Sequence, residues 1–134
     1  MIKGLGVDLV ETIRIRKTIE TRGEKFLKRV FTSDEIKYCL KYKRSDATIR
    51  SVPYPNVPTL RSGSRLRVGA SGRVPYPHFA ARFAAKEAFL KAIGTGWGRK
   101  ISPAWKEIEV EKPSGKPPKI ILHGKALKIY HRMK

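Results

Sequence analysis

Residues 78–93, with the sequence HFAARFAAKEAFLKAI, are the strongest helix signal in the chain and decide how the rest of it can pack. On a helical wheel the large apolar side chains fall on one side and five alanines fall nearly opposite. A helix that is apolar on two sides is normally buried on both, so we expect a long central helix that ends at Gly94-Thr95-Gly96. The large side chains are Phe79, Phe83, Phe89, Leu90 and Ile93, and the alanines are Ala81, Ala84, Ala85, Ala88 and Ala92.

The charged residues of this helix are confined to two narrow strips. Glu87 and Lys91 are one turn apart on one strip, and Arg82 and Lys86 are one turn apart on the other. The spacing alone favours an ordinary ion pair between Glu87 and Lys91, which stabilises a helix by a few tenths of a kcal/mol. Ionised groups on a largely buried helix also need partners, so the same residues are candidates for a functional site.

The first ten residues predict a strand whose two faces differ in character. Two glycines beside a carboxylate leave room either for a ligand or for close packing against the alanine side of the central helix. If that packing brings Asp8 to Glu87, two carboxylates meet beside basic side chains. Such an arrangement suits Mg²⁺, which shares phosphate oxygens with a substrate. One face of the strand 2–10 carries Leu5, Val7 and Leu9, and the other carries Gly4, Gly6 and Asp8.

The remaining elements predict an α+β fold in which an antiparallel sheet packs on the central helix. Thr32 and Glu35 have the spacing of a capping box that begins a helix. Gly23 separates two helical segments before it, and a Pro- and Gly-rich turn joins two alternating segments after the central helix. The expected helices cover 11–22, 26–30, 32–40 and 124–133, and the expected hairpin strands cover 105–111 and 119–123.

Composition indicates a single domain, 1–134, that acts on an anionic partner. The chain has 134 residues, 40% of them hydrophobic, which is enough for one core. Lys and Arg number 30 against 11 Asp and Glu, a net charge of +19, so nucleic acid, a phosphate-rich cofactor, an acidic protein or an anionic membrane surface could bind. The single cysteine, Cys39, excludes an internal disulfide and favours a cytoplasmic location. We expect no membrane-spanning segment, because no run of eighteen apolar residues occurs.

The segment 47–77 differs abruptly in composition from the rest. It contains five of the nine prolines, five arginines, no lysine and no acidic residue. Long irregular loops are uncommon inside compact domains, so we interpret it as a mobile, solvated insertion that interrupts the domain. A basic arm that binds nucleic acid is the alternative interpretation of the same segment.

Several blocks of sequence, in order along the chain, resemble the bacterial holo-acyl-carrier-protein synthases of the 4′-phosphopantetheinyl transferase family. The resemblance covers residues 1–46 and 78–130. The family has two further strands and a His-x-Ser-x-Ser-His stretch beyond the end of this sequence, so we expect a sheet that is incomplete at the C-terminus. The blocks are GLGVD at 4–8, FTSDE at 31–35, ARFAAKEAF at 81–89, GTG at 94–96, IEV at 108–110 and GKP at 115–117.

The resemblance implies a Mg²⁺-dependent enzyme of fatty acid biosynthesis. It would transfer 4′-phosphopantetheine from coenzyme A to a serine of apo acyl carrier protein, in cytoplasmic homotrimers with active sites between subunits. The metal carboxylates of the family match Asp8 and Glu87, which with Lys91 form the catalytic set. The coenzyme-binding positions match Arg82, Lys86, Lys91, Gly94, Thr95 and Gly96, and the surface that meets the carrier protein matches Arg14, Arg22, Lys25 and Phe26.

Two other functions stay open at this stage. The chain could be an inactive relative that only binds acyl carrier protein through its first helix. It could also be a small basic nucleic-acid-binding module, which the net charge alone supports and no nucleic-acid motif accompanies.

Overall fold

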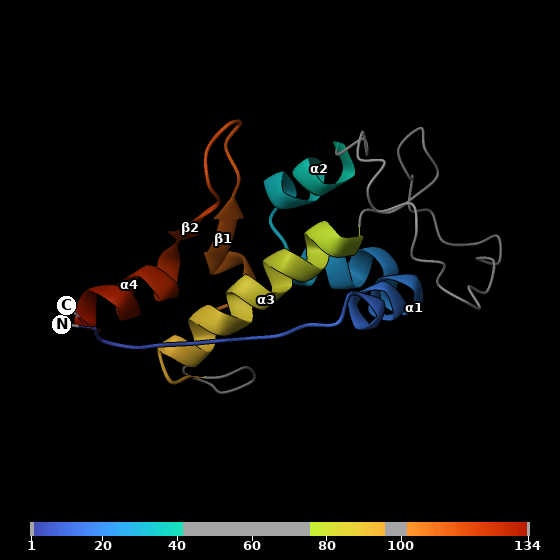
Figure 1. The fold of residues 1–134 in the computed structure, drawn as a ribbon. Coiled ribbons are helices and arrows are strands. Elements are labelled where there is room, and N and C mark those ends of the chain that lie inside the picture. Colours follow the sequence, from blue (N-terminus) through green and yellow to red (C-terminus); the bar gives the residue numbers. More distant parts are fainter. Residues whose placement is uncertain (1, 42–75, 96–101, 134) are drawn as a thin grey trace.

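The computed structural model of the chain describes residues 2–41, 76–95 and 102–133 (Figure 1). A long helix, α3, lies in the middle of the described residues. The extended N-terminal segment runs along one side of it, and α2 and a β-hairpin lie on the other (Figure 1). The predicted α+β class is confirmed. The elements are α1 (Thr12–Val30), α2 (Ser33–Lys41), α3 (Tyr76–Ala92), the 3₁₀ turn η2 (Trp105–Glu107), β1 (Ile108–Glu111), β2 (Lys119–Leu122) and α4 (Gly124–Met133).

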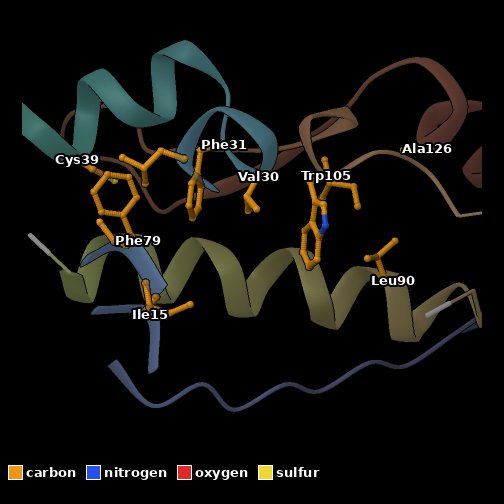
Figure 2. Close-up of a cluster of buried hydrophobic side chains, with 12 residues drawn as sticks. Ile15, Val30, Phe31, Cys39, Phe79, Leu90, Trp105 and Ala126 are labelled. Carbon is orange, nitrogen blue, oxygen red and sulfur yellow. The ribbon is translucent and has the colours of Figure 1, made fainter. Parts of the chain in front are cut away.

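The central helix α3 is buried on the side of its large apolar residues, as predicted. Its side chains join those of α1, α2, η2 and β1 in one hydrophobic core (Figure 2). The helix begins at Tyr76, two residues earlier than expected, because a proline at position 77 is tolerated in the first turn. The last two residues of the insertion predicted at 47–77 therefore belong to α3, and its other residues lie outside the described part of the chain. The core includes Ile15, Ile19, Leu27, Phe31, Phe79, Leu90, Trp105 and Ile108.

The two helices predicted on either side of Gly23 form one interrupted helix, α1. Gly23 has a φ of 53°, a conformation that glycine adopts without strain, and the chain kinks there. Beyond the kink α1 continues to Val30, whose carbonyl faces α3. Near the start of α3, the hydroxyl of Tyr76 donates to Glu20 Oε1 at 3.2 Å, which fastens the first turn of α3 to α1.

The capping box predicted for α2 is confirmed. Thr32 N donates to Glu35 Oε2 at 2.8 Å, and Glu35 N donates to Thr32 Oγ1 at 3.2 Å. The Thr32 hydroxyl also donates to Glu109 Oε1 at 2.9 Å, so the start of α2 is attached to β1. The cap therefore orients α2 against the hairpin as well as starting the helix.

The predicted hairpin is present, but its first strand is shorter than expected. β1 and β2 pair in antiparallel fashion, with Ile108 opposite Leu122. Residues 105–107 form the 3₁₀ turn because Glu107 is used as a cap: its Oε2 accepts from Ala104 N and its Oε1 from Lys125 N, both at 2.7 Å. One carboxylate thus closes the turn before β1 and begins α4.

The strand predicted at the N-terminus is not present in the described part of the chain, although the predicted alternation of its side chains between two faces is correct. Residues 2–10 are extended and belong to no sheet of the described residues. The glycine face packs directly on α3: a Cβ at Gly4 would lie 2.1 Å from Ala92 O, and one at Gly6 would lie 1.9 Å from Ala88 O. The close packing against the alanine side is therefore the correct interpretation of the glycines. The opposite face is 67–91% exposed and consists of Leu5, Val7 and Leu9.

Candidate active site

The N-terminal segment places Asp8 against the C-terminal half of α3. Asp8 Oδ1 accepts from Lys91 Nζ at 2.6 Å, and the same ammonium donates to Val7 O at 3.1 Å. The Asp8 side chain is only 11% exposed. The interpretation of Glu87 and Lys91 as an ordinary pair within the helix is wrong, because Lys91 forms its ion pair with Asp8, 83 residues away.

Glu87 lies within electrostatic reach of Asp8. Burial raises the pKa of Glu87, the negative charge of Asp8 raises it further, and Lys91 acts in the opposite direction. Asp8 Oδ2 is buried and has no hydrogen-bond partner. The structure therefore brings together Asp8, Glu87 and Lys91, the set that the sequence predicted as catalytic.

These two carboxylates fit a divalent cation. The unsatisfied oxygen of Asp8 and the repulsion that raises the pKa of Glu87 would both be relieved by positive charge. Among the described residues no three His, Cys, Asp or Glu gather, so the chain would offer two carboxylate ligands here. A site with few protein ligands suits Mg²⁺, which keeps waters and takes phosphate oxygens from a substrate.

Arg82 lies away from these carboxylates, next to α2 and the hairpin. Its side chain is buried, with the guanidinium 4.3 Å from the centre of the Tyr38 ring and Nη1 donating to His78 O at 3.3 Å. Its Nε is buried and has no partner. A buried guanidinium with a free donor is a good candidate to bind an anion.

Arg82 lines a cleft of about 1000 Å³ between α3, α2 and the hairpin. Among its lining residues are Lys112 and Lys119, and none is acidic. The loop 113–117 was predicted from the sequence as a turn and as part of a family block, but not as part of a cleft. The sequence signal that could have identified the cleft is a turn with Gly115 between Lys112 and Lys116. Gly115 adopts a φ of 67° there. The other lining residues are Tyr38, His78, Ala81, Ala85, Val110, Pro113, Ser114, Gly115, Pro118 and Ile120.

The two groups of predicted site residues lie on nearly opposite sides of α3. Glu87 follows Arg82 by five residues, which is roughly 140° around the helix and about 7.5 Å along it. The N-terminal segment that carries Asp8 and the α2–hairpin layer lie on opposite sides of the helix in both views (Figures 1 and 2). The structure therefore separates the cleft of Arg82 from the carboxylates of the same chain.

The prediction that Lys86 binds the coenzyme is wrong. Its side chain is 0% exposed, and its ammonium donates to Val30 O at 2.8 Å, Glu35 Oε2 at 2.7 Å and Trp105 O at 3.1 Å. An ammonium has three protons, so these acceptors use all of them. Burial lowers the pKa of Lys86, and the hydrogen bond to Glu35 counteracts that effect. Lys86 is part of the interior.

The end of α3 has the stop that the sequence predicted. Gly94 has a φ of 69°, and its N–H donates to Lys91 O while Thr95 N donates to Leu90 O, the pattern of a Schellman motif. Thr95 is buried and its Oγ1 has no hydrogen-bond partner. Its hydroxyl is therefore free, just beyond the C-terminal end of α3. Gly96 lies outside the described residues.

The predicted carrier-protein surface is on α1. The side chains of Arg14, Arg22 and Lys25 are exposed. Phe26 is half-buried: its ring packs against Phe31 and against a ring of α3, so little of it is free for a partner. The basic residues are therefore better placed for docking than the phenylalanine.

Comparison with known proteins identifies the family. Residues 4–133 match the model of the 4′-phosphopantetheinyl transferase superfamily. The chain belongs to this superfamily. The family resemblance inferred from the sequence blocks is thereby confirmed.

Members of the superfamily with related sequences are named as synthases. The holo-acyl-carrier-protein synthase of Chlamydia trachomatis serovar L2 is 36% identical over 118 residues, which are 88% of this chain and 72% of that protein. The synthase of Koribacter versatilis is 36% identical over 129 residues, which are 96% of this chain and 78% of that protein.

Solved structures of the superfamily have the same fold. The synthase of Neisseria meningitidis superposes with a TM-score of 0.64 at 26% identity, covering 98% of this chain and 79% of that one. The synthase of Bacillus anthracis, in complex with coenzyme A (3′,5′-ADP), superposes with a TM-score of 0.59 at 30% identity, covering 92% of this chain and 78% of that one. In the described residues no helix is long and apolar enough to span a lipid bilayer.

Proposed function

We propose that this chain is a holo-acyl-carrier-protein synthase, which transfers 4′-phosphopantetheine from coenzyme A to a serine of apo acyl carrier protein. The convergence of Asp8 and Glu87 beside Lys91 is the observation that carries the proposal. The names of the relatives support it, as does the coenzyme A complex of the Bacillus anthracis synthase.

Each residue of the convergent set has a distinct role in this reaction. Asp8 and Glu87 would hold Mg²⁺, which supplies charge neutralisation and polarisation of the pyrophosphate when bound. Glu87 would also accept the proton of the attacking serine hydroxyl. Lys91 donates to a phosphate oxygen. The bond from serine Oγ to phosphorus forms, the bond from phosphorus to the oxygen of adenosine 3′,5′-bisphosphate breaks, and the latter leaves.

The cleft of Arg82 takes the nucleotide end of coenzyme A. The free Nε of Arg82 and the basic, acid-free lining suit the phosphates of that end. The Tyr38 ring, already stacked on the guanidinium, offers an aromatic surface beside them. Gly94 and Thr95 are proposed to contact the same coenzyme, and the unpartnered Oγ1 of Thr95 supports this.

The active site is completed by a second copy of the chain. The cleft and the carboxylates of one chain lie roughly 140° apart around α3, so we propose that one coenzyme molecule contacts the cleft of one chain and the carboxylates of another. A neighbouring copy could present its cleft to the carboxylates of the first, and a ring of three such contacts closes. The exposed apolar face of residues 2–9 adjoins Asp8 and would be covered in such a homotrimer.

The basic residues of α1 dock the acidic carrier protein. Arg14, Arg22 and Lys25 are exposed, and no ion pair engages them within the residues that the structure describes. Their charge steers an acidic partner toward the site and is screened by salt. A cytoplasmic location is proposed with this function, on the basis of the single cysteine.

Mass spectrometry of an apo acyl carrier protein incubated with coenzyme A, Mg²⁺ and this protein tests the proposal. We expect one phosphopantetheine to be added, and none to a carrier whose acceptor serine is replaced by alanine. Asp8→Asn and Glu87→Gln should reduce transfer to the level seen without Mg²⁺, whereas Asp34→Asn, at an exposed carboxylate of α2, should leave it unchanged.

Other outcomes of this experiment would reject the proposal. Wild-type protein that binds the carrier but transfers nothing would be the inactive relative. Salt-dependent binding of a DNA duplex or RNA, without binding of coenzyme A, would indicate the nucleic-acid module.

A further inference from the structure

Lys86 and Glu35 form a fully buried ion pair that joins five parts of the fold. Lys86 Nζ reaches the last carbonyl of α1, the Glu35 carboxylate of α2 and a carbonyl of η2. Glu35 Oε1 accepts from Val110 N of β1 at 3.0 Å, and Glu35 Oε2 accepts from Thr32 N at 2.8 Å. Every proton of the ammonium and both oxygens of the carboxylate therefore have partners.

A buried ion pair of this kind adds little to the stability of the fold. Removing two charges from water costs free energy that the attraction between them only partly offsets, and apolar residues of similar size often do as well or better. What the pair supplies is direction, because three hydrogen bonds to three different segments permit one orientation of the Lys86 side chain. Together with the core side chains Phe79 and Leu90 of the same helix, they hold α3 in one rotation about its axis.

The residue whose direction this rotation controls is Glu87. It follows Lys86 directly, so its side chain leaves the helix about 100° further around, on the side of Asp8. The segment that carries Asp8 is tied in two places: Gly4 and Gly6 pack it against carbonyls of α3, and it continues into α1, which begins at Thr12. The approach of the two carboxylates thus depends on the rotation of α3 as well as on the seating of the N-terminal segment.

We propose that Lys86 and Glu35 are positioning residues, which orient Glu87 toward Asp8 and so create the cation site. The inference rests on the proposed function, since it concerns the same carboxylates. It also assigns Lys86 a role other than contact with the coenzyme. Groups that orient metal ligands from outside the coordination shell typically change metal affinity by about 10- to 100-fold when removed.

The test measures Mn²⁺ binding by electron paramagnetic resonance, together with the Mg²⁺ and coenzyme A dependence of transfer. Lys86→Met is compared with Lys37→Met, which removes an exposed lysine that pairs with Asp34 on α2. We expect Lys86→Met to weaken Mn²⁺ binding, and to raise the Mg²⁺ concentration for half-maximal rate, by about tenfold or more. The KM for coenzyme A should change much less, and Lys37→Met should behave as wild type.

The outcomes separate this inference from simpler explanations. A merely destabilised protein would lose maximal rate without a change in Mn²⁺ affinity, and a folded Lys86→Met protein with wild-type Mn²⁺ affinity overturns the inference. So does an increase confined to the KM for coenzyme A. If Lys86→Met does not fold, Lys86→Met with Glu35→Gln, which leaves no buried charge at the pair, takes its place under the same criteria. Wild-type protein that binds no Mn²⁺ rejects the cation site and, with it, this role of Lys86.

Discussion

Gly6→Ala tests the seating of the N-terminal segment by adding one methyl group. The new Cβ would lie 1.9 Å from Ala88 O and 2.6 Å from Ala92 N, and ordinary contact begins at about 3.4 Å. The segment must therefore move about 1.5 Å away from α3 (3.4 minus 1.9). Both atoms belong to the helix backbone, which cannot turn aside as a side chain can.

The displacement should lower kcat strongly and the free energy of unfolding only moderately. Asp8 is two residues from Gly6, so its 2.6 Å ion pair with Lys91 would be stretched and Oδ2 moved away from Glu87. A misplacement of about 1 Å commonly costs about a hundredfold in rate, and we expect that loss in kcat. Overpacking of this kind costs about 1–3 kcal/mol in the free energy of unfolding.

Steady-state transfer to apo acyl carrier protein and urea denaturation measure the two effects of Gly6→Ala. Lys3→Ala, an exposed substitution in the same segment, is the matched control and should leave both quantities near wild type. A Gly6→Ala protein that keeps wild-type kcat would refute the reasoning, because it would mean that the position of Asp8 against α3 does not matter for the reaction.

The two remaining predictions concern the cleft and the core. Arg82→Ala should raise the KM for coenzyme A about tenfold or more while changing Mn²⁺ affinity little, because a buried charge-assisted contact to an anion is lost on the far side of α3 from the carboxylates. An unchanged KM would contradict the assignment of the cleft. Burial raises the pKa of Cys39 to about 12 from 9.0, so its thiolate is about a thousandfold scarcer than that of an exposed cysteine. A disulfide exchange reagent at pH 8 should label Cys39 only after denaturation, and rapid labelling of the native protein would contradict its burial.

The failure of the Lys86 prediction has a clear physical cause. In the sequence Lys86 and Lys91 both lie close to Glu87, and that proximity alone made them look alike. On the helical wheel, however, Lys86 falls among the large apolar side chains, one turn from Phe83 and from Leu90. In the structure one ammonium is enclosed by three acceptors from distant segments and the other is half-exposed beside Asp8. Helical spacing places Lys86 on the buried side of α3, but it does not reveal which oxygens of distant segments accept its protons there.

The hairpin and the N-terminus differed from expectation for a similar reason. The alternation of residues 105–111 predicts a strand, yet Glu107 accepts two backbone N–H groups and turns its segment into a 3₁₀ turn. The alternation of residues 2–10 correctly separates two faces, but pairing with another strand requires a neighbour that the described residues do not place there. Local patterns define faces, and distant partners define which face is covered.

Interactions between residues close together in the sequence determined where several helices begin, break and end. They include the capping box at Thr32 and Glu35, the break at Gly23, the stop at Gly94 and the two-sided apolar character of α3, and the ordered sequence blocks added the family. Only the tertiary structure decided that Asp8 reaches Lys91 and Glu87, that Lys86 is interior, and that the cleft of Arg82 opens on the other side of α3. These outcomes depend on contacts between residues up to 83 positions apart, whose geometry is set by the packing of whole elements against one another.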